Sequence, residues 1–177
     1  MYFNAVGTPV EGWSWSKPAD AAQSIREQYS ALLRAKRSVV AAVSDLPALL
    51  LWTRIGPDVS AVGNLLLHLR GSEHQWIANK VGVRPLVRDR DAEFAARSGL
   101  SLPELLSALH ATGAESHEVI AGFDDDAARN YRSDQGFSIS FILTYAAHHY
   151  ALHLGQIVVV REFLEPGFRL EDRLSGG

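Results

Sequence analysis

Apolar residues recur at three- and four-residue spacing in four long stretches of the chain, which is the period of an amphipathic α-helix. We predict helices over about residues 19–44, 59–81, 101–122 and 138–164. No convincing pair of strands, internal repeat or flexible linker lies between these stretches. The pattern therefore predicts an all-α protein whose residues 1–177 form a single domain, with a bundle core at about 19–164.

Capping residues mark the ends of these helices. Asp58 or Ser60 can cap the second helix, and Ser101 with Glu104 forms a capping box at the start of the third. The connection between the second and third helices, about residues 82–99, is long. Four long helices with one such connection are typical of a four-helix bundle with a crossover.

The fourth predicted helix is apolar on almost every side. Its first residues, 137–141, could also form a short strand, but the apolar run continues far beyond strand length. A helix without a polar face is buried on every side, so it needs cover from loops or from a partner chain. We therefore expect a homodimer.

Composition and charge restrict the partners and the chemistry. The chain has no Cys, which excludes disulfides, Cys-based zinc sites and a Cys nucleophile. The net charge is −3 and no Lys/Arg cluster occurs, so we do not expect a nucleic-acid partner. The most apolar stretch, residues 139–147, is too short to span a membrane, and residues 1–10 do not resemble a secretion signal. We expect a cytoplasmic protein without a membrane partner.

Three of the seven histidines are candidate metal ligands in strongly apolar helices. His149 and His153 are four residues apart, so they lie one above the other on one helix face and can bind one ion. His68 lies in an equally apolar stretch of the second helix. Together they would form a metal site with open positions for water or substrate. The alternative is that they are core histidines bonded to backbone carbonyls and water.

Other patterns that look like metal or catalytic sites have simpler interpretations. Tyr150 follows His149, so the glutamate of the His-Glu-x-x-His motif of zinc proteases is missing. We interpret Asp124–Asp126 as a solvated loop and helix cap. His110 and His117 are too far apart along the third helix to share an ion, and we expect both at the surface. His74 and His148 should face solvent, an interface or a backbone acceptor.

Two segments carry a resemblance to a known family. The run from Asn64 to His68, followed by Trp76, and the segment from His149 to Ile157 resemble the DinB/YfiT superfamily of metal-dependent enzymes. Its most specific part is His-x3-His-x-Gly-Gln-Ile. The resemblance implies a four-helix bundle in up-down-down-up order. It also implies that the metal ligands are His68, His149 and His153, with nickel or zinc as the ion.

The same resemblance implies a class of reaction. Characterised members of the superfamily include transferases and isomerases that use a low-molecular-weight thiol such as bacillithiol or mycothiol. We expect a metal-bound thiol or water to attack a small electrophilic substrate, as in a thiol-dependent S-transferase or a hydrolase. The alternative is a non-catalytic, metal-binding dimer that the cell produces under stress. A pocket that opens onto the metal would indicate an enzyme. A fourth protein ligand that closes the site would indicate a structural metal.

Two residues are candidates for a catalytic role. Gln156 lies one turn beyond His153 on the same face, where it could orient a ligand or a bound water. It could equally be a surface or interface glutamine. Tyr145 lies four residues before His149 and could offer its hydroxyl to the substrate, although core packing is the simpler interpretation.

Four further residues could support a site. Asn64 lies one turn before His68 and could hydrogen-bond to a ligand, or it could serve packing alone. Glu73 lies on the apolar stripe of its helix, where it could bond a ligand histidine or, more simply, pair with an arginine. Trp13 and Trp15 could cover one end of the bundle or form an aromatic wall of a pocket.

Overall fold

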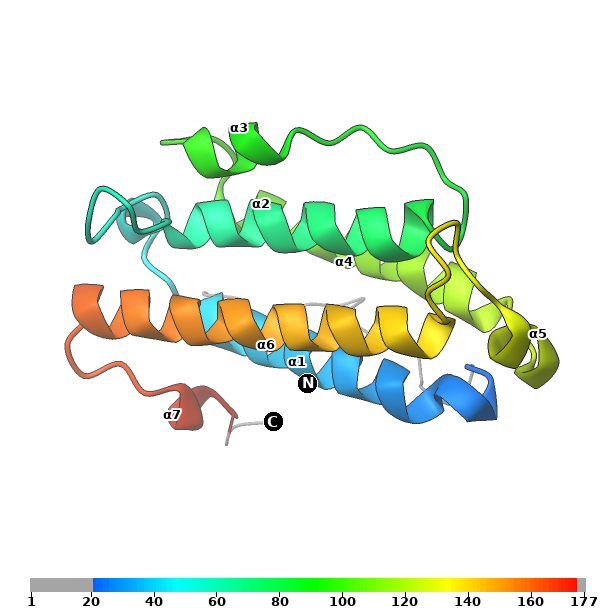
Figure 1. Cartoon of the computed structure of the whole chain (residues 1–177). Helices are drawn as coiled ribbons and strands as arrows, with labels where there is room; N and C mark the ends of the chain where they lie inside the picture. Colours follow the sequence, from blue (N-terminus) through cyan, green and yellow to red (C-terminus); the bar gives the residue numbers. More distant parts are fainter. Residues whose placement is uncertain (1–20, 175–177) are drawn as a thin grey trace.

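Four long helices lie side by side in the computed structural model, which describes residues 21–174 (Figure 1). None of these residues lies in a strand, so the prediction of an all-α protein is confirmed. The first and last of the four run in one direction and the middle two in the opposite direction (Figure 1). They are α1 (Arg26–Val43), α2 (Val62–Glu73), α4 (Leu102–Ala121) and α6 (Ile139–Leu164).

Shorter helical segments join and extend these four helices. Most of them are single turns. They are the 3-10 segments Gln23–Ile25 and Ala48–Leu50, the π-helical segment His74–Asn79, α3 (Arg90–Ala95), α5 (Asp125–Asn130) and α7 (Leu170–Leu174). Gln23–Ile25 and His74–Asn79 lie within the predicted helices 19–44 and 59–81, and the others were not predicted from the sequence. The predicted start of the first helix at residue 19 lies outside the described residues; α1 itself begins at Arg26.

The start of α2 differs from the prediction. The helix begins at Val62, so Asp58 and Ser60 lie too far upstream to cap it. Asn64 takes this role, because its Oδ1 accepts a hydrogen bond from the Ala61 N–H at 3.1 Å. Its amide nitrogen also donates to the backbone oxygens of Glu93 (2.8 Å) and Ala96 (2.9 Å). Asn64 thus joins the start of α2 to α3.

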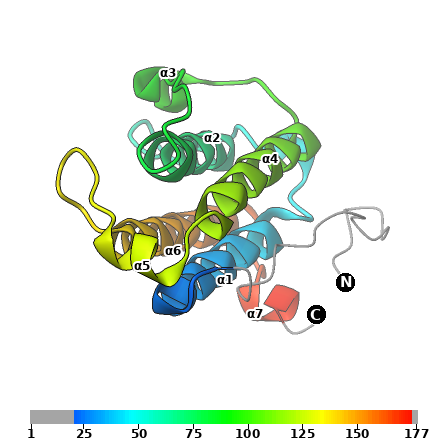
Figure 2. The same ribbon diagram turned by 90° about the vertical axis from the view of Figure 1, so that its right-hand side faces the viewer.

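The crossover after α2 carries α3 along the outer side of the bundle. Asp89 caps α3 by accepting a hydrogen bond from the Ala92 N–H at 2.9 Å. An end-on view shows α3 beside α2, away from α1 and α6 (Figure 2). The crossover therefore places the side chains of α3 next to the outer part of α2. The predicted capping box follows it, with Glu104 accepting from the Ser101 N–H at 2.7 Å.

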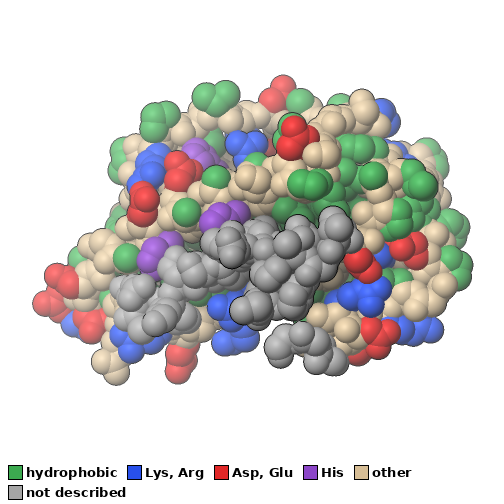
Figure 3. All heavy atoms as spheres, turned by 180° about the vertical axis from the view of Figure 1, so that it is seen from behind, with side chains coloured by type: hydrophobic (Ala, Val, Ile, Leu, Met, Phe, Trp, Pro, Cys, Tyr) green, Lys and Arg blue, Asp and Glu red, His purple; other side chains and the backbone are tan. Residues whose placement is uncertain are grey.

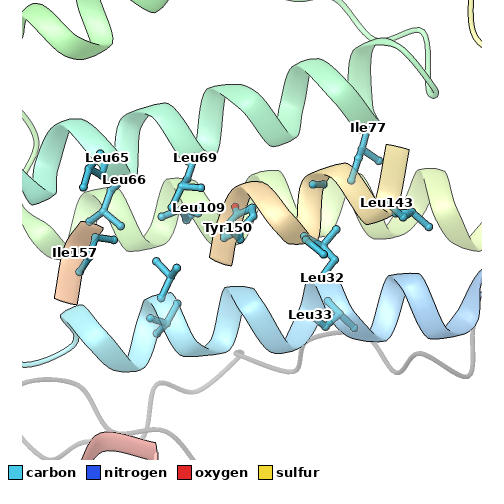
Figure 4. Close-up of a cluster of buried hydrophobic side chains, with 14 of the residues drawn as sticks. Leu32, Leu33, Leu65, Leu66, Leu69, Ile77, Leu109, Leu143, Tyr150 and Ile157 are labelled. Atoms are coloured by element: carbon cyan, nitrogen blue, oxygen red, sulfur yellow. The ribbon is translucent and has the colours of Figure 1, made fainter. Parts of the chain in front are cut away.

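Apolar side chains from all four long helices meet between them. Figure 4 shows Leu32 of α1, Leu66 of α2, Leu109 of α4 and Ile157 of α6 pointing into this core, and all four are fully or almost fully buried. Lys36 and Glu73 are buried here too, with Lys36 Nζ 2.6 Å from Glu73 Oε1. The hydroxyl of buried Tyr150 donates to Glu73 Oε2 at 2.5 Å. This Lys36–Glu73–Tyr150 network joins α1, α2 and α6.

One face of α6 is not covered in the described chain. Ser138 caps the helix by accepting from the Phe141 N–H (3.1 Å), which excludes the alternative of a strand at residues 137–141. The expectation that this helix is buried on every side is wrong for the single chain, because an apolar stripe of α6 points outward. Leu152 is 61% exposed at its centre. The stripe comprises Phe141, Tyr145, Leu152, Val159 and Phe163.

The remaining surface is mixed. On the face opposite to that of Figure 1, basic side chains are interspersed with acidic ones and with apolar groups (Figure 3). Among the described helices, none combines the length and the apolar composition that crossing a bilayer requires.

Candidate metal centre

Three histidine side chains converge between α2 and α6. His149 Nε2 lies 3.1 Å from His68 Nε2 and 2.8 Å from His153 Nε2. The three possible ligand atoms all lie within 4.8 Å of one another. His68 and His153 are buried and His149 is half-buried. The structure thus brings together the three residues that the sequence singled out, which we call the histidine trio.

The other nitrogen of each ring, Nδ1, has a hydrogen-bond partner outside the trio. These partners are Glu93 Oε2 for His68 (2.9 Å), Ser72 Oγ for His149 (2.9 Å) and Gln156 Oε1 for His153 (2.6 Å). His68 Nδ1 also lies 3.1 Å from Arg88 Nη2. An oxygen of a carboxylate or an amide only accepts, so we assign the proton to Nδ1 in the hydrogen bonds of His68 to Glu93 and of His153 to Gln156. Their Nε2 atoms therefore present lone pairs to the common point, as a metal-binding imidazole does.

The arrangement fits a bound cation better than a hydrogen-bonded core cluster. His149 Nε2 has at most one hydrogen to donate to the two Nε2 lone pairs that face it, whereas a cation at the common point would bind all three nitrogens. Nitrogen ligands of one ion at 2.0–2.1 Å lie about 2.8–3.4 Å apart for octahedral to tetrahedral angles. The observed separations of 3.1 and 2.8 Å are close to this range. His68, His149 and His153 could therefore hold a divalent ion together.

Protons compete little with a cation at this site. Burial and, to a smaller extent, the neighbouring positive groups lower the pKa of His149 to about 4. Burial is also the largest cause that lowers the pKa of His68 and of His153. All three imidazoles are therefore neutral at neutral pH, which is the form that binds metal.

Glu93 is itself held by Arg88. The guanidinium makes two hydrogen bonds to the carboxylate, from Nε to Oε1 (2.7 Å) and from Nη2 to Oε2 (2.8 Å), and a third to Gln75 Oε1 (2.5 Å). Burial raises the pKa of Glu93, but the hydrogen bonds from Arg88 and His68 outweigh this effect and lower it overall. Glu93 therefore stays ionised beside His68.

A glycine of α2 makes room for this pair. A Cβ at Gly71 would lie 2.2 Å from Glu93 Oε1 and 2.7 Å from Arg88 Nε, so a larger residue would displace one of them. Sequence reasoning missed Arg88 and Glu93, which lie in the crossover without a recognisable pattern. The only local signal was a glycine inside a predicted helix, which often marks close packing.

The two catalytic candidates lie in different surroundings. Gln156 hydrogen-bonds to His153, which agrees with the first of its two interpretations, the orientation of a ligand. Tyr145 is 39% exposed, so core packing is wrong for it. Its ring lies 5.9 Å from the His149 ring and 4.8 Å from the Trp76 ring, measured between centroids. Tyr145 thus belongs to the outer rim of the trio.

The supporting candidates have other roles than those expected at the site. Asn64 caps α2 and contacts α3, with no hydrogen bond to a histidine of the trio. Glu73 pairs with Lys36 instead of an arginine, and it lies in the core without bonding a ligand histidine. Trp13 and Trp15 lie outside the described residues.

The other histidines are only in part as expected. His148 is exposed, but His110 and His117 are half-buried, so the expected surface position is wrong for them. His117 Nδ1 lies 3.1 Å from the hydroxyl of buried Tyr29, which packing of α4 against α1 explains. Half-buried His74 lies 3.5 Å from Glu115. As expected of a helix cap, Asp124 accepts a hydrogen bond from the first turn of α5.

Comparison with protein-family models identifies a family for this chain. The family model described as Mycothiol-S-transferase matches residues 28–166, a range that contains all three histidines of the trio. No match was found among curated proteins.

Proposed function

Since the chain belongs to the mycothiol S-transferase family, a DinB/YfiT-like family, we propose that it is a metal-dependent thiol S-transferase. In this proposal the histidine trio holds a divalent ion, nickel or zinc, to which three imidazoles are equally suited. A low-molecular-weight thiol, mycothiol or a relative of it, is the cosubstrate. A small electrophilic molecule accepts its sulfur.

The convergence of the trio is the observation that carries the proposal. Three neutral imidazoles leave the charge of a bound ion uncompensated, and such an ion favours the thiolate form of a thiol. The thiolate sulfur then forms a bond to an electrophilic carbon. The leaving group departs with the electron pair of the broken bond, and the thiol proton passes to solvent.

The protein's own side chains prepare this step. Glu93 and Gln156 hold the rings of His68 and His153 with Nε2 directed to the common point. Ser72 holds the His149 ring in the same way. Tyr145 is the proposed substrate contact, because its ring lies 5.9 Å from the His149 ring, measured between centroids. The chain has no Cys, so the reacting sulfur must arrive on a small molecule.

The fold-level part of the proposal follows the superfamily. We propose that residues 1–177 form one domain, that its four long helices make an up-down-down-up bundle, and that two copies form a homodimer. The directions of α1, α2, α4 and α6 support the bundle order (Figure 1). The exposed stripe of α6 supports the homodimer.

Metal analysis combined with a conjugation assay tests the function. Freshly purified protein should contain about one equivalent of nickel or zinc and accelerate conjugation of mycothiol to a chlorobimane probe. A chelator should reduce this rate to the uncatalysed level. His153→Ala should lose both metal and activity while its circular dichroism stays helical. The matched control His148→Ala changes an exposed histidine of the same helix and should keep both.

Two results would contradict the proposal in different ways. A full complement of metal in His153→Ala would remove the trio as the binding site. Stoichiometric metal in the wild type without thiol transfer to any electrophile of a broad panel would instead favour a non-catalytic metal-binding protein.

A further inference from the structure

We propose that Tyr150 positions the metal centre: its hydroxyl, bound to Glu73, holds α6 at the distance from α2 at which His149 reaches the other histidines of the trio. This inference rests on the proposed function and deepens it, because it gives a buried network that the reaction itself does not use a role in forming the site. The network is that of Lys36, Glu73 and Tyr150, which joins α1, α2 and α6. Tyr150 acts through His149, its neighbour in the chain, and is therefore a positioning residue.

Two consecutive residues of α2 bond to two consecutive residues of α6. Ser72 Oγ lies 2.9 Å from His149 Nδ1, and Glu73 Oε2 accepts a hydrogen bond from the Tyr150 hydroxyl at 2.5 Å. Within residues 21–174, these are the two hydrogen bonds that α2 and α6 share outside the trio itself. A shift of α6 away from α2 would therefore break the bond of Tyr150 and withdraw the ring of His149 at the same time.

The carboxylate of Glu73 is a fixed point in the core. On its other side, Lys36 Nζ lies 2.6 Å from Glu73 Oε1, and the same ammonium lies 5.7 Å from the centroid of the Tyr150 ring. All three residues are only 2% exposed, and Figure 4 shows Tyr150 among the apolar side chains of the core. Hydrogen bonds to a charged group are stronger than those between neutral groups, and at a buried position water does not compete for them. Glu73 therefore gives the Tyr150 hydroxyl one defined position.

His149 is a ligand whose place depends on the distance between the two helices. Its Nε2 lies 2.8 Å from His153 Nε2 on the same helix and 3.1 Å from His68 Nε2 on α2. The first distance follows from the helix period, whereas the second requires that α2 and α6 lie at the right separation. Metal–nitrogen bonds hold only within about 0.2 Å of their ideal length. A small change in the separation of the helices would therefore weaken the site.

A role in stability alone would have a different consequence. Loss of the Tyr150 hydroxyl would then lower the free energy of unfolding, while the folded variant would bind the ion as the wild type does. A positioning role instead changes the site in a protein that is still folded. Tyr29 offers the matched comparison, because this tyrosine is also buried and its hydroxyl lies 3.1 Å from His117 Nδ1, between α1 and α4 and outside the trio.

Cobalt(II) binding tests the inference without a turnover assay. The d–d absorption of bound cobalt reports its coordination geometry, and competition with a chelator gives the Kd. Tyr150→Phe should raise the Kd at least about threefold, which is less than the roughly 10- to 100-fold typical of a direct partner of a ligand. Its d–d bands should also shift. Tyr29→Phe should keep the wild-type Kd and bands, and circular dichroism should show that both variants are helical.

Glu73→Gln separates the position of Tyr150 from the stability of the core. The new amide can still bond to the Tyr150 hydroxyl, as acceptor or as donor, but it leaves Lys36 without a counter-charge. We therefore expect this variant to unfold at a lower urea concentration than Tyr150→Phe and yet to keep a cobalt Kd and spectrum closer to those of the wild type. If it does not fold, the comparison of Tyr150→Phe with Tyr29→Phe decides.

Three results would overturn the inference and leave the proposed function standing. The wild-type Kd and bands in Tyr150→Phe would mean that its hydroxyl serves the core alone. An equal change in Tyr29→Phe would mean that the loss of any buried hydroxyl loosens the site. A larger change in folded Glu73→Gln than in Tyr150→Phe would mean that the site follows the stability of the core. Absence of cobalt binding to the wild type would overturn the proposed function and this inference together.

Discussion

Glu93 of the crossover accepts a hydrogen bond from Nδ1 of His68 on α2, at 2.9 Å. The two residues are 25 positions apart in the chain. This bond holds the ring of one ligand from a segment that is not part of the four long helices. The metal centre therefore depends on the crossover as well as on α2 and α6.

Removal of the Glu93 carboxylate should weaken metal binding. Glu93→Gln loses the charged acceptor that orients His68, and such second partners typically contribute 10- to 100-fold to metal affinity. Competition with a chromogenic zinc chelator measures the Kd. Glu162→Gln, which changes an exposed acid of α6, is the control and should leave the Kd unchanged. An equal Kd in both variants would show that Glu93 does not support the ligand.

Gly→Ala substitutions at Gly71 and Gly155 test whether the metal centre needs a glycine for close packing. Both lie inside helices, where Gly→Ala normally stabilises by roughly 0.5–1 kcal/mol. A Cβ at Gly155 meets nothing within 4 Å, so Gly155→Ala should show this gain in urea unfolding. A Cβ at Gly71 would collide with Glu93 and Arg88. Gly71→Ala should lack the gain and bind metal less tightly. A simple gain at both positions would contradict this packing.

Removing the charge of only one partner of the buried Lys36–Glu73 pair should strongly destabilise the fold. Glu73→Gln keeps an acceptor for Tyr150 but leaves the ammonium of Lys36 without a counter-charge in the core. We expect a loss of roughly 3–5 kcal/mol in the free energy of unfolding. The double variant Lys36→Met with Glu73→Gln should recover much of it. Urea unfolding measures both, and a loss below about 1 kcal/mol in the single variant would argue against an ionised pair.

Asp45 should contribute a stability that is lost in acid. Burial raises its pKa, but hydrogen bonds from Arg161 and Arg173 outweigh this and lower it overall. A lowered pKa means that the contribution is present above the ordinary pKa of about 3.9 and disappears as the pH falls through the folded-state value. Since Asp45 is partly exposed, we expect about 0.5–1 kcal/mol. Asp45→Asn should be less stable than the wild type at pH 6, and the difference should vanish near pH 2.

The stripe of α6 should mediate the homodimer. Phe141 and Phe163 lie equally far before and after Leu152, as do Tyr145 and Val159, so two antiparallel α6 helices can pair each residue with an apolar partner. Light scattering should give a dimer for the wild type and a monomer for Leu152→Glu. Ala151→Glu, exposed beside the stripe, should stay dimeric. A monomeric wild type at high concentration would end the homodimer proposal.

Helical periodicity was enough to predict the long helices and to single out the trio. His149 and His153 share a face of α6 because their spacing matches the helix period, which is a local property of the chain. The ends of the helices were less predictable than their positions. The start of α2 depends on Asn64, whose amide contacts α3, and no local rule reports such a contact.

An all-α protein with two histidines on one helix face and a third in another apolar helix thus follows from the sequence alone. That the three rings meet, and that Glu93, Ser72 and Gln156 hold them, follows only from the packing of α2, α3 and α6. The difference arises from distance along the chain. A helix period relates residues a few positions apart, whereas packing relates distant segments through side-chain contacts that no spacing encodes.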